Sequence, residues 1–129
     1  MSGSHSTKLR VWKWADPLYD VSVFLLKGAG VDAQKYLNKT FDEGYVGEWT
    51  GAKTLFISKA QGCAVVLWFP AWWSGKDATH LSVLAHESFH AAEFTLRERG
   101  MTLTDASDEA YAYYIAWMFR ECYKRLATV

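Results

Sequence analysis

The chain has 129 residues, of which 50% are hydrophobic and 16% are aromatic. This length fits one domain with a core of its own. Lys plus Arg equals Asp plus Glu, at 14 each, so charge gives no argument for a nucleic acid or an anionic membrane as partner. The N-terminus is polar, and no run approaches the roughly 18 apolar residues of a membrane span. We therefore expect a cytoplasmic protein, and its oligomeric state stays open.

The first half of the chain predicts strands and one short helix, after a flexible N-terminal arm over residues 1–8. The single domain is expected over residues 9–129. Residues 9–14 and 21–26 are rich in β-branched and aromatic side chains, which favours strands, and Asp16-Pro17 is a turn signal between them. Asp32 then caps a helix that is expected to end at Phe41.

The second half predicts two strands and two helices. Residues 53–59 and 62–69 are strand-like, and the second run is apolar enough for the centre of a sheet. Asp77 or Thr79 caps a helix that Gly100 ends, and Asp105 and Ser107 are candidate caps for the last helix. The pattern predicts an α+β fold, with an antiparallel or mixed sheet of about three to five strands packed against these two helices.

The most informative pattern is His86-Glu87-Ser88-Phe89-His90, an H-E-x-x-H motif within a segment of helical periodicity. Positions four apart lie one turn above each other, about 6 Å along a helix, so both histidines can direct an imidazole at one ion. Glu87 lies beside the pair and is suited to take a proton from a zinc-bound water. The motif predicts a Zn²⁺ site with His86 and His90 as ligands and Glu87 as general base.

A catalytic zinc needs a third protein ligand, and the acidic residues of the last helix supply the candidates. Glu109 shares a helix face with Tyr113, Ala116 and Trp117, so a helix packed beside the motif can present Glu109 to the ion. Asp108 would point about 100° away and is the second choice. We therefore expect Glu109 to complete the metal site.

The two-histidine helix followed by Asp108-Glu109-Ala110 resembles the gluzincin class of zinc peptidases, in which a following helix supplies a glutamate ligand. The resemblance covers roughly residues 79–117 and implies a minimal zincin-like domain that hydrolyses peptide bonds. It departs at Ala112 and Tyr113, where thermolysin-like members carry a serine and an aspartate, so the carboxylate that orients a ligand histidine has no counterpart. The layout is also similar to small phage and prophage proteins, which would place a phage-encoded chain in the host cytoplasm.

Three tryptophans lie just before the motif. Trp68, Trp72 and Trp73 lead into the histidine helix and are predicted either to line a substrate-binding wall or to fix the entry to that helix.

Two further side chains are weighed as auxiliary groups. Tyr113 lies one turn beyond Glu109, where its hydroxyl can reach a ligand or the oxyanion, with simple packing as the alternative. His80 lies about 10 Å along the helix from Glu87, too far to bind the same zinc, and is predicted to be a surface histidine rather than a substrate-facing one.

Cys63 and Cys122 lack C-x-x-C spacing and are expected to be reduced core residues, with a disulfide as the open alternative.

The leading hypothesis is a zinc-dependent metallohydrolase. The favoured activity is that of a peptidase, with a peptide or protein as substrate. Zinc would polarise the scissile carbonyl and its bound water, and Glu87 would remove the proton. In zincins an edge strand binds the extended peptide, but the sequence does not identify that strand. The alternative is a non-catalytic binding or assembly protein, in which zinc holds two helices together and exposed aromatic residues meet a partner.

Overall fold

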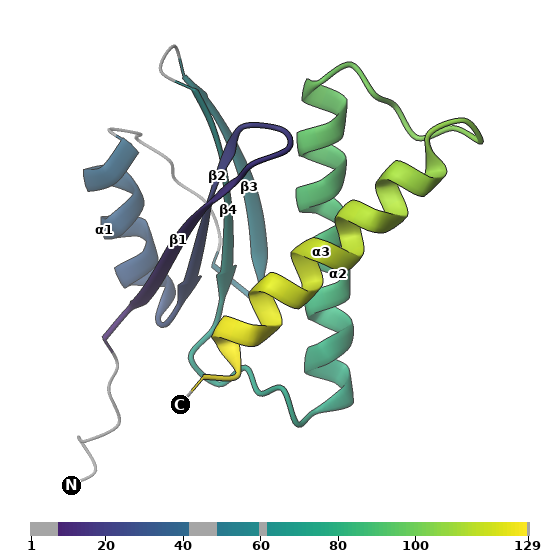
Figure 1. Ribbon diagram of the computed structural model, residues 1–129. Helices are drawn as coiled ribbons and strands as arrows, with labels where there is room; N and C mark the ends of the chain where they lie inside the picture. Colours follow the sequence, from purple (N-terminus) through teal and green to yellow (C-terminus); the bar gives the residue numbers. More distant parts are fainter. Residues whose placement is uncertain (1–7, 42–48, 60–61, 129) are drawn as a thin grey trace, which may run out of the picture.

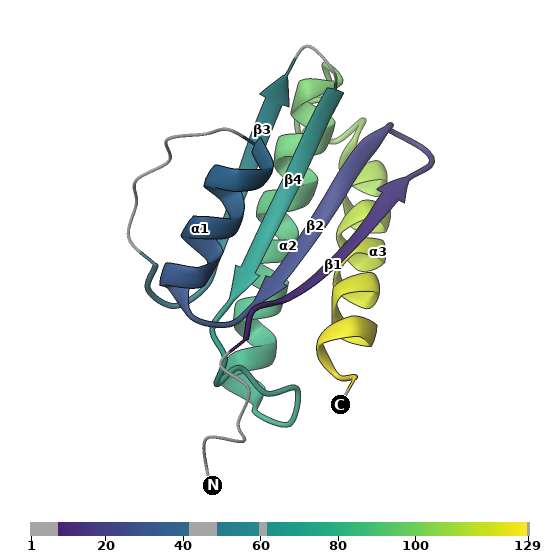
Figure 2. The same ribbon diagram turned by 90° about the vertical axis from the view of Figure 1, so that its left-hand side faces the viewer.

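The computed structural model describes residues 8–41, 49–59 and 62–128, and these form four strands and three helices. Helix α1 covers one face of a mixed four-stranded sheet, while α2 and α3 cover the other (Figures 1 and 2). The arrangement is α+β, as predicted. In chain order the elements are β1 (Arg10–Asp16), β2 (Val21–Lys27), α1 (Gly30–Phe41), β3 (Lys53–Lys59), β4 (Gly62–Phe69), α2 (Ala78–Glu98) and α3 (Asp108–Leu126).

The sheet has the strand order β1-β2-β4-β3. Strands β1 and β2 form an antiparallel hairpin, β2 and β4 are parallel, and β3 and β4 are antiparallel. Val65 of β4 lies opposite Val23 on one side and Phe56 on the other. The apolar run in β4 therefore lies inside the sheet, as predicted, whereas β1 and β3 are its edges.

Alternation along the central strands divides the core into two clusters, because successive side chains of a strand point to opposite faces. Val65, Leu67 and Phe69 face α2 and α3. Ala64, Val66 and Trp68 face α1. Both faces of β4 are thus covered, which explains why its sequence is almost wholly apolar.

Helix α2 begins at a side-chain cap and ends at a glycine. The Asp77 carboxylate accepts hydrogen bonds from the backbone N–H of Thr79 and His80, at 2.8 and 3.2 Å. Gly100 follows the helix with φ +80°, a conformation that favours glycine. Ser107 occupies the N-cap position of α3 without capping it, because its hydroxyl donates to the Thr102 carbonyl instead.

In the described ranges, no helix has the length and hydropathy needed to cross a membrane.

Candidate metal centre

The two histidines of the motif converge on the outer face of α2. Their Nε2 atoms are 3.0 Å apart, and their ring centroids are 4.6 Å apart with the rings nearly perpendicular. Two nitrogens bound to one tetrahedral zinc at about 2.1 Å would lie about 3.4 Å apart. His86 is exposed and His90 is half-buried beside the Phe94 ring. The 3.0 Å separation is that of a hydrogen bond between the two rings, so one zinc ion would replace this hydrogen bond and require the nitrogens to move apart by about 0.4 Å.

Glu87 lies on the side of α2 that faces the sheet, and only 7% of it is exposed. The Thr54 hydroxyl of β3 donates a hydrogen bond of 2.6 Å to Glu87 Oε1, and it also lies 3.3 Å from the Glu87 backbone carbonyl. A buried carboxylate is stable only when its oxygens have such partners. The edge strand therefore fixes the orientation of the predicted general base.

A cleft of about 550 Å³ runs beside these residues and includes both His86 and Glu87 in its wall. It lies between the chain that leads into β3, the loop that follows β4, and the first half of α2. Its other lining residues are Thr50, Gly51, Ala52, Pro70, Trp72, Trp73, Thr79, His80, Ser82 and Val83. The first two residues of the motif thus face a space large enough for part of an extended peptide.

Glu109, the predicted third ligand, lies exposed in the first turn of α3. No group of three or more His, Cys, Asp and Glu side chains in the described part of the chain is placed to hold a metal ion. His86 lines the cleft beside the chain that enters β3, and His90 stacks on Phe94, which contacts Phe56 of β3. Helix α3 packs on the β1 side of the sheet (Figure 2). The structure therefore brings together two of the three predicted ligands and leaves Glu109 apart.

Apolar packing holds α3 against α2. Ala92 and Leu96 of α2 share a buried cluster with Tyr114, Met118 and Cys122 of α3. Burial of each of the larger apolar side chains contributes on the order of 1.5–3 kcal/mol to the free energy of unfolding. The two helices therefore have a source of cohesion that does not depend on a metal.

The three predicted substrate-contacting tryptophans have different environments. Trp72 is 63% exposed and lines the cleft. Trp73 also borders it but is buried, and its indole N–H donates to the His80 carbonyl at 2.8 Å, which fixes the entry to α2. Trp68 lies on the opposite sheet face under α1, with its indole N–H bonded to the Gly28 carbonyl at 2.9 Å. Trp68 is therefore not part of the cleft, because strand alternation turns it away.

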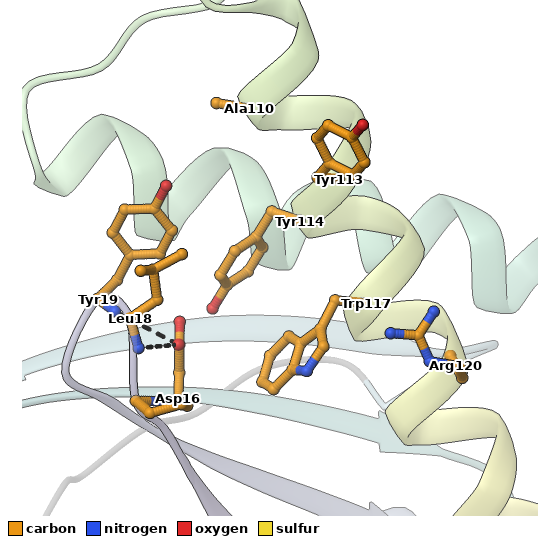
Figure 3. A pocket seen from close by; sticks show the side chains of 9 residues that line it. Asp16, Leu18, Tyr19, Ala110, Tyr113, Tyr114, Trp117 and Arg120 are labelled. Carbon is orange, nitrogen blue, oxygen red and sulfur yellow. Dashed lines mark hydrogen bonds between the residues drawn. The ribbon is translucent and has the colours of Figure 1, made fainter.

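The two auxiliary candidates also lie in different places. His80 borders the cleft, but its Nδ1 accepts the Ser74 backbone N–H at 2.9 Å, so the ring anchors the loop before α2. Tyr113 is 74% exposed and lines a different pocket, between α3 and the β1–β2 turn (Figure 3). The structure therefore does not bring the Tyr113 hydroxyl to the histidine pair.

Thr54 and residues 50–52 are among the site residues that the sequence does not predict. Thr54 is 33 positions from Glu87, and no local pattern marks a threonine in an edge strand as the partner of a buried carboxylate. Only the register of β3 on β4 and the position of α2 on the sheet bring the two together.

Comparison of the chain with protein-family models, with curated proteins and with solved structures found no match. The site must therefore be interpreted from its own chemistry.

Proposed function

We propose that the protein is a zinc-dependent metallohydrolase and that it acts as a peptidase. Its reaction would take place where α2 meets the edge strand β3. The observation that carries the proposal is the 3.0 Å approach of the His86 and His90 Nε2 atoms, next to a buried Glu87. Two imidazoles and an adjacent carboxylate are the groups that a hydrolytic zinc site uses, and His86 and Glu87 line the cleft.

The donor set fits zinc in part. His86 and His90 would supply two neutral imidazole ligands, the ligand type that zinc favours in catalytic sites. Bound there, zinc would lower the pKa of a water molecule and polarise a carbonyl oxygen. Glu109 is the proposed third ligand, and its participation requires the first turn of α3 to move toward the histidine pair. Asp108, in the same turn, is the alternative.

Glu87 is the proposed general base. The Thr54 hydroxyl donates its hydrogen bond to Oε1 of the Glu87 carboxylate. The other oxygen, Oε2, can then take up the proton of the attacking water and return it to the leaving amine. The hydrogen bond holds the carboxylate in one rotamer, so little reorientation is needed for the transfer.

Strand β3 is the proposed platform for the substrate. It is an edge strand, and no strand of the described part lies beyond it. The cleft lies beside the chain that enters β3, and the exposed Trp72 ring also lines it. An extended peptide can add to such an edge by backbone hydrogen bonds while one side chain packs on the indole. This arrangement favours unstructured peptides as substrates.

The test compares wild type with Glu87→Gln on a library of unstructured peptides in the presence of stoichiometric zinc. Glutamine keeps an oxygen that accepts the Thr54 hydrogen bond but cannot take up a proton, so we expect the fold and the zinc to be retained and cleavage to fall by about 10²-fold or more. Glu93→Gln, at an exposed ion pair on the same helix, is the matched control and should cleave normally. Full activity in Glu87→Gln would overturn the mechanism.

A further inference from the structure

A further pocket, of about 450 Å³, lies at the end of the molecule where β1 begins and where β2 and α3 end. The segment between β4 and α2 completes its wall, and Figures 1 and 2 show these four segments at the same end of the fold. Its volume is in the range of pockets that hold small organic molecules. Its lining residues are Arg10, Lys27, Trp73, Ser74, Gly75, Lys76, Tyr123, Leu126, Ala127 and Thr128.

Three cations line this pocket, and none of its described lining residues is an aspartate or a glutamate. Arg10 begins β1, Lys27 ends β2, and Lys76 lies in the loop before α2. Within the part of the chain that the structure describes, none of the three forms an ion pair with a carboxylate. Arg10 and Lys27 are half-buried, and Lys76 is exposed. The pocket therefore carries a positive charge that the described side chains do not balance.

Arg10 and Lys27 lie directly opposite each other on the antiparallel strands β1 and β2. Residues paired in this way share a face of the sheet, with Cβ atoms about 5 Å apart, and like charges at such positions are destabilising. Burial, and after it the charge of Arg10, lowers the pKa of Lys27. The fold therefore keeps two like charges together at a cost in stability, and a bound anion would offset that cost.

The Arg10 guanidinium is held in place but keeps free donors. One of its Nη atoms donates to the Thr128 carbonyl at 3.1 Å, and the group lies 4.6 Å from the centroid of the Trp12 ring. A guanidinium has five N–H donors, and among the described residues only this one hydrogen bond is made. The carbonyl groups at the end of α3 carry only partial negative charge, which is too little to balance three cations. Arg10 is therefore oriented and has donors left for an anion.

The rest of the wall includes apolar and aromatic side chains. Leu126 is buried, and Tyr123 is 38% exposed, with its ring stacked on Phe119 at 6.3 Å between centroids. A Cβ at Gly75 would lie 3.1 Å from the Tyr123 ring, so the glycine allows the loop before α2 to approach α3 closely. The pocket therefore combines a group of cations with an aromatic wall.

From this arrangement we infer that the pocket binds a small organic phosphate monoester. A doubly charged phosphate has oxygens on several sides, which suits one arginine and two lysines that come from three segments of the chain. An apolar or aromatic body on the phosphate would pack against Tyr123. A neutral or cationic molecule would leave the repulsion between Arg10 and Lys27 in place. The inference does not depend on zinc or on peptide hydrolysis.

The test uses metal-free protein of all 129 residues and the probe phenyl phosphate. Phenyl sulfate has nearly the same shape but one negative charge, whereas the phosphate carries two at about pH 8. Calorimetry gives the affinities, and NMR of the Lys27 side chain gives its pKa. We expect phenyl phosphate to bind at least about tenfold more tightly than phenyl sulfate and to raise the Lys27 pKa. Equal affinity for the two probes, or an unchanged Lys27 pKa at saturation, would overturn the inference.

A peptide that contains phosphotyrosine distinguishes a protein ligand from a small molecule, because it presents the same group on an extended chain. We expect this peptide to bind no more tightly than phenyl phosphate, since the pocket contacts only the phosphate and its ring. If the peptide bound at least about tenfold more tightly, the ligand would be a phosphorylated protein, and the assignment to a small molecule would be wrong.

Two variants locate the interaction. Lys27→Met keeps most of the apolar length of the side chain but removes the charge, and should weaken the binding of phenyl phosphate at least about tenfold. Because this change also removes the repulsion with Arg10, the variant should resist urea at least as well as wild type, which separates lost binding from lost folding. Lys76→Met should also weaken binding. Wild-type affinity in either variant would refute the assignment.

Lys13→Met is the matched control. Lys13 is an exposed lysine of the same strand as Arg10, but its ammonium lies over the Phe24 ring, on the face of the sheet that α1 covers. Its replacement should leave the affinity for phenyl phosphate unchanged. A loss in Lys13→Met as large as that in Lys27→Met would show that only the overall charge matters, and would refute a site in this pocket.

Discussion

The Thr54 hydroxyl of β3 donates a 2.6 Å hydrogen bond to the Glu87 carboxylate of α2, across 33 positions of sequence. This contact joins the edge strand to the proposed general base. Since Glu87 is only 7% exposed, the hydrogen bond both stabilises the fold and sets the direction of the carboxylate. The edge strand and the motif helix are therefore parts of one site.

Replacing Thr54 by valine should destabilise the protein. Valine has nearly the same shape but no hydroxyl, so the Glu87 carboxylate would stay buried with one donor fewer, at a cost of about 1–3 kcal/mol in the free energy of unfolding. Urea unfolding measures this difference. Thr54→Ser keeps the hydroxyl and should lose much less. Equal stability of the valine and serine variants would mean that the hydrogen bond contributes nothing.

Zinc should move the start of α3 if Glu109 is the third ligand. We expect zinc to shift the backbone amide signals of residues 107–111, and Glu109→Ala to remove that shift and to weaken zinc binding at least about tenfold. Asp108→Ala tests the alternative ligand, and Asp105→Ala is an exposed acidic control in the preceding loop. Unchanged zinc affinity in both Glu109→Ala and Asp108→Ala would leave the histidines as the only protein ligands.

Glu121 should contribute to stability at neutral pH and lose that contribution in acid. Burial alone would raise the pKa of Glu121, but Arg125 and Lys124, each 3.0 Å from its carboxylate, outweigh burial and hold the pKa below the usual 4.5. The contribution is complete above pH 4.5 and disappears as the pH falls through the lower pKa of the folded state.

The variant that tests this pair is Glu121→Gln. Because the charges are partly screened by solvent, it should be about 0.5–1 kcal/mol less stable than wild type at pH 7, and the difference should shrink as the pH drops toward 3. Thermal unfolding at several pH values measures it. A difference that is constant over this range would exclude a charge effect.

The two cysteines should react with a thiol reagent at very different rates. Both are free; Cys122 is fully buried in the core and Cys63 is half-buried. Burial raises the pKa of the Cys122 thiol, which further suppresses the reactive thiolate. We expect one rapidly reacting thiol in the native protein, abolished by Cys63→Ser and kept in Cys122→Ala. Two rapidly reacting thiols would contradict the packing of α3.

Much of the fold could be predicted from sequence, because it depends on local patterns. The apolar run of β4 has no polar alternation, which placed that strand inside the sheet. The Asp77 cap and Gly100 gave the ends of α2 to within a few residues. The parallel pairing of β2 with β4 and the choice of β3 as an edge could not be predicted, because they depend on how the chain crosses over the sheet.

The candidate site also has one part that the sequence predicts and one part that it does not. The spacing of His86 and His90 is a property of one helix, so their convergence could be predicted. The position of Glu109 depends on how α3 packs against α2, and periodicity placed it on a helix face without showing where that face points. Nearness in sequence makes Trp68 a candidate for the substrate wall or for the entry to α2, but β-strand alternation turns it to the opposite face of the sheet.

The most direct test of the account is equilibrium zinc binding to the metal-free protein, with His86→Ala, His90→Ala and His80→Asn as variants. Asparagine at position 80 can still accept the Ser74 hydrogen bond, so it serves as the matched control. We predict one zinc per chain for wild type and His80→Asn, and at least about tenfold weaker binding for each of the other two. Absence of stoichiometric zinc in wild type, or unchanged affinity without His86 or His90, would contradict the metal centre.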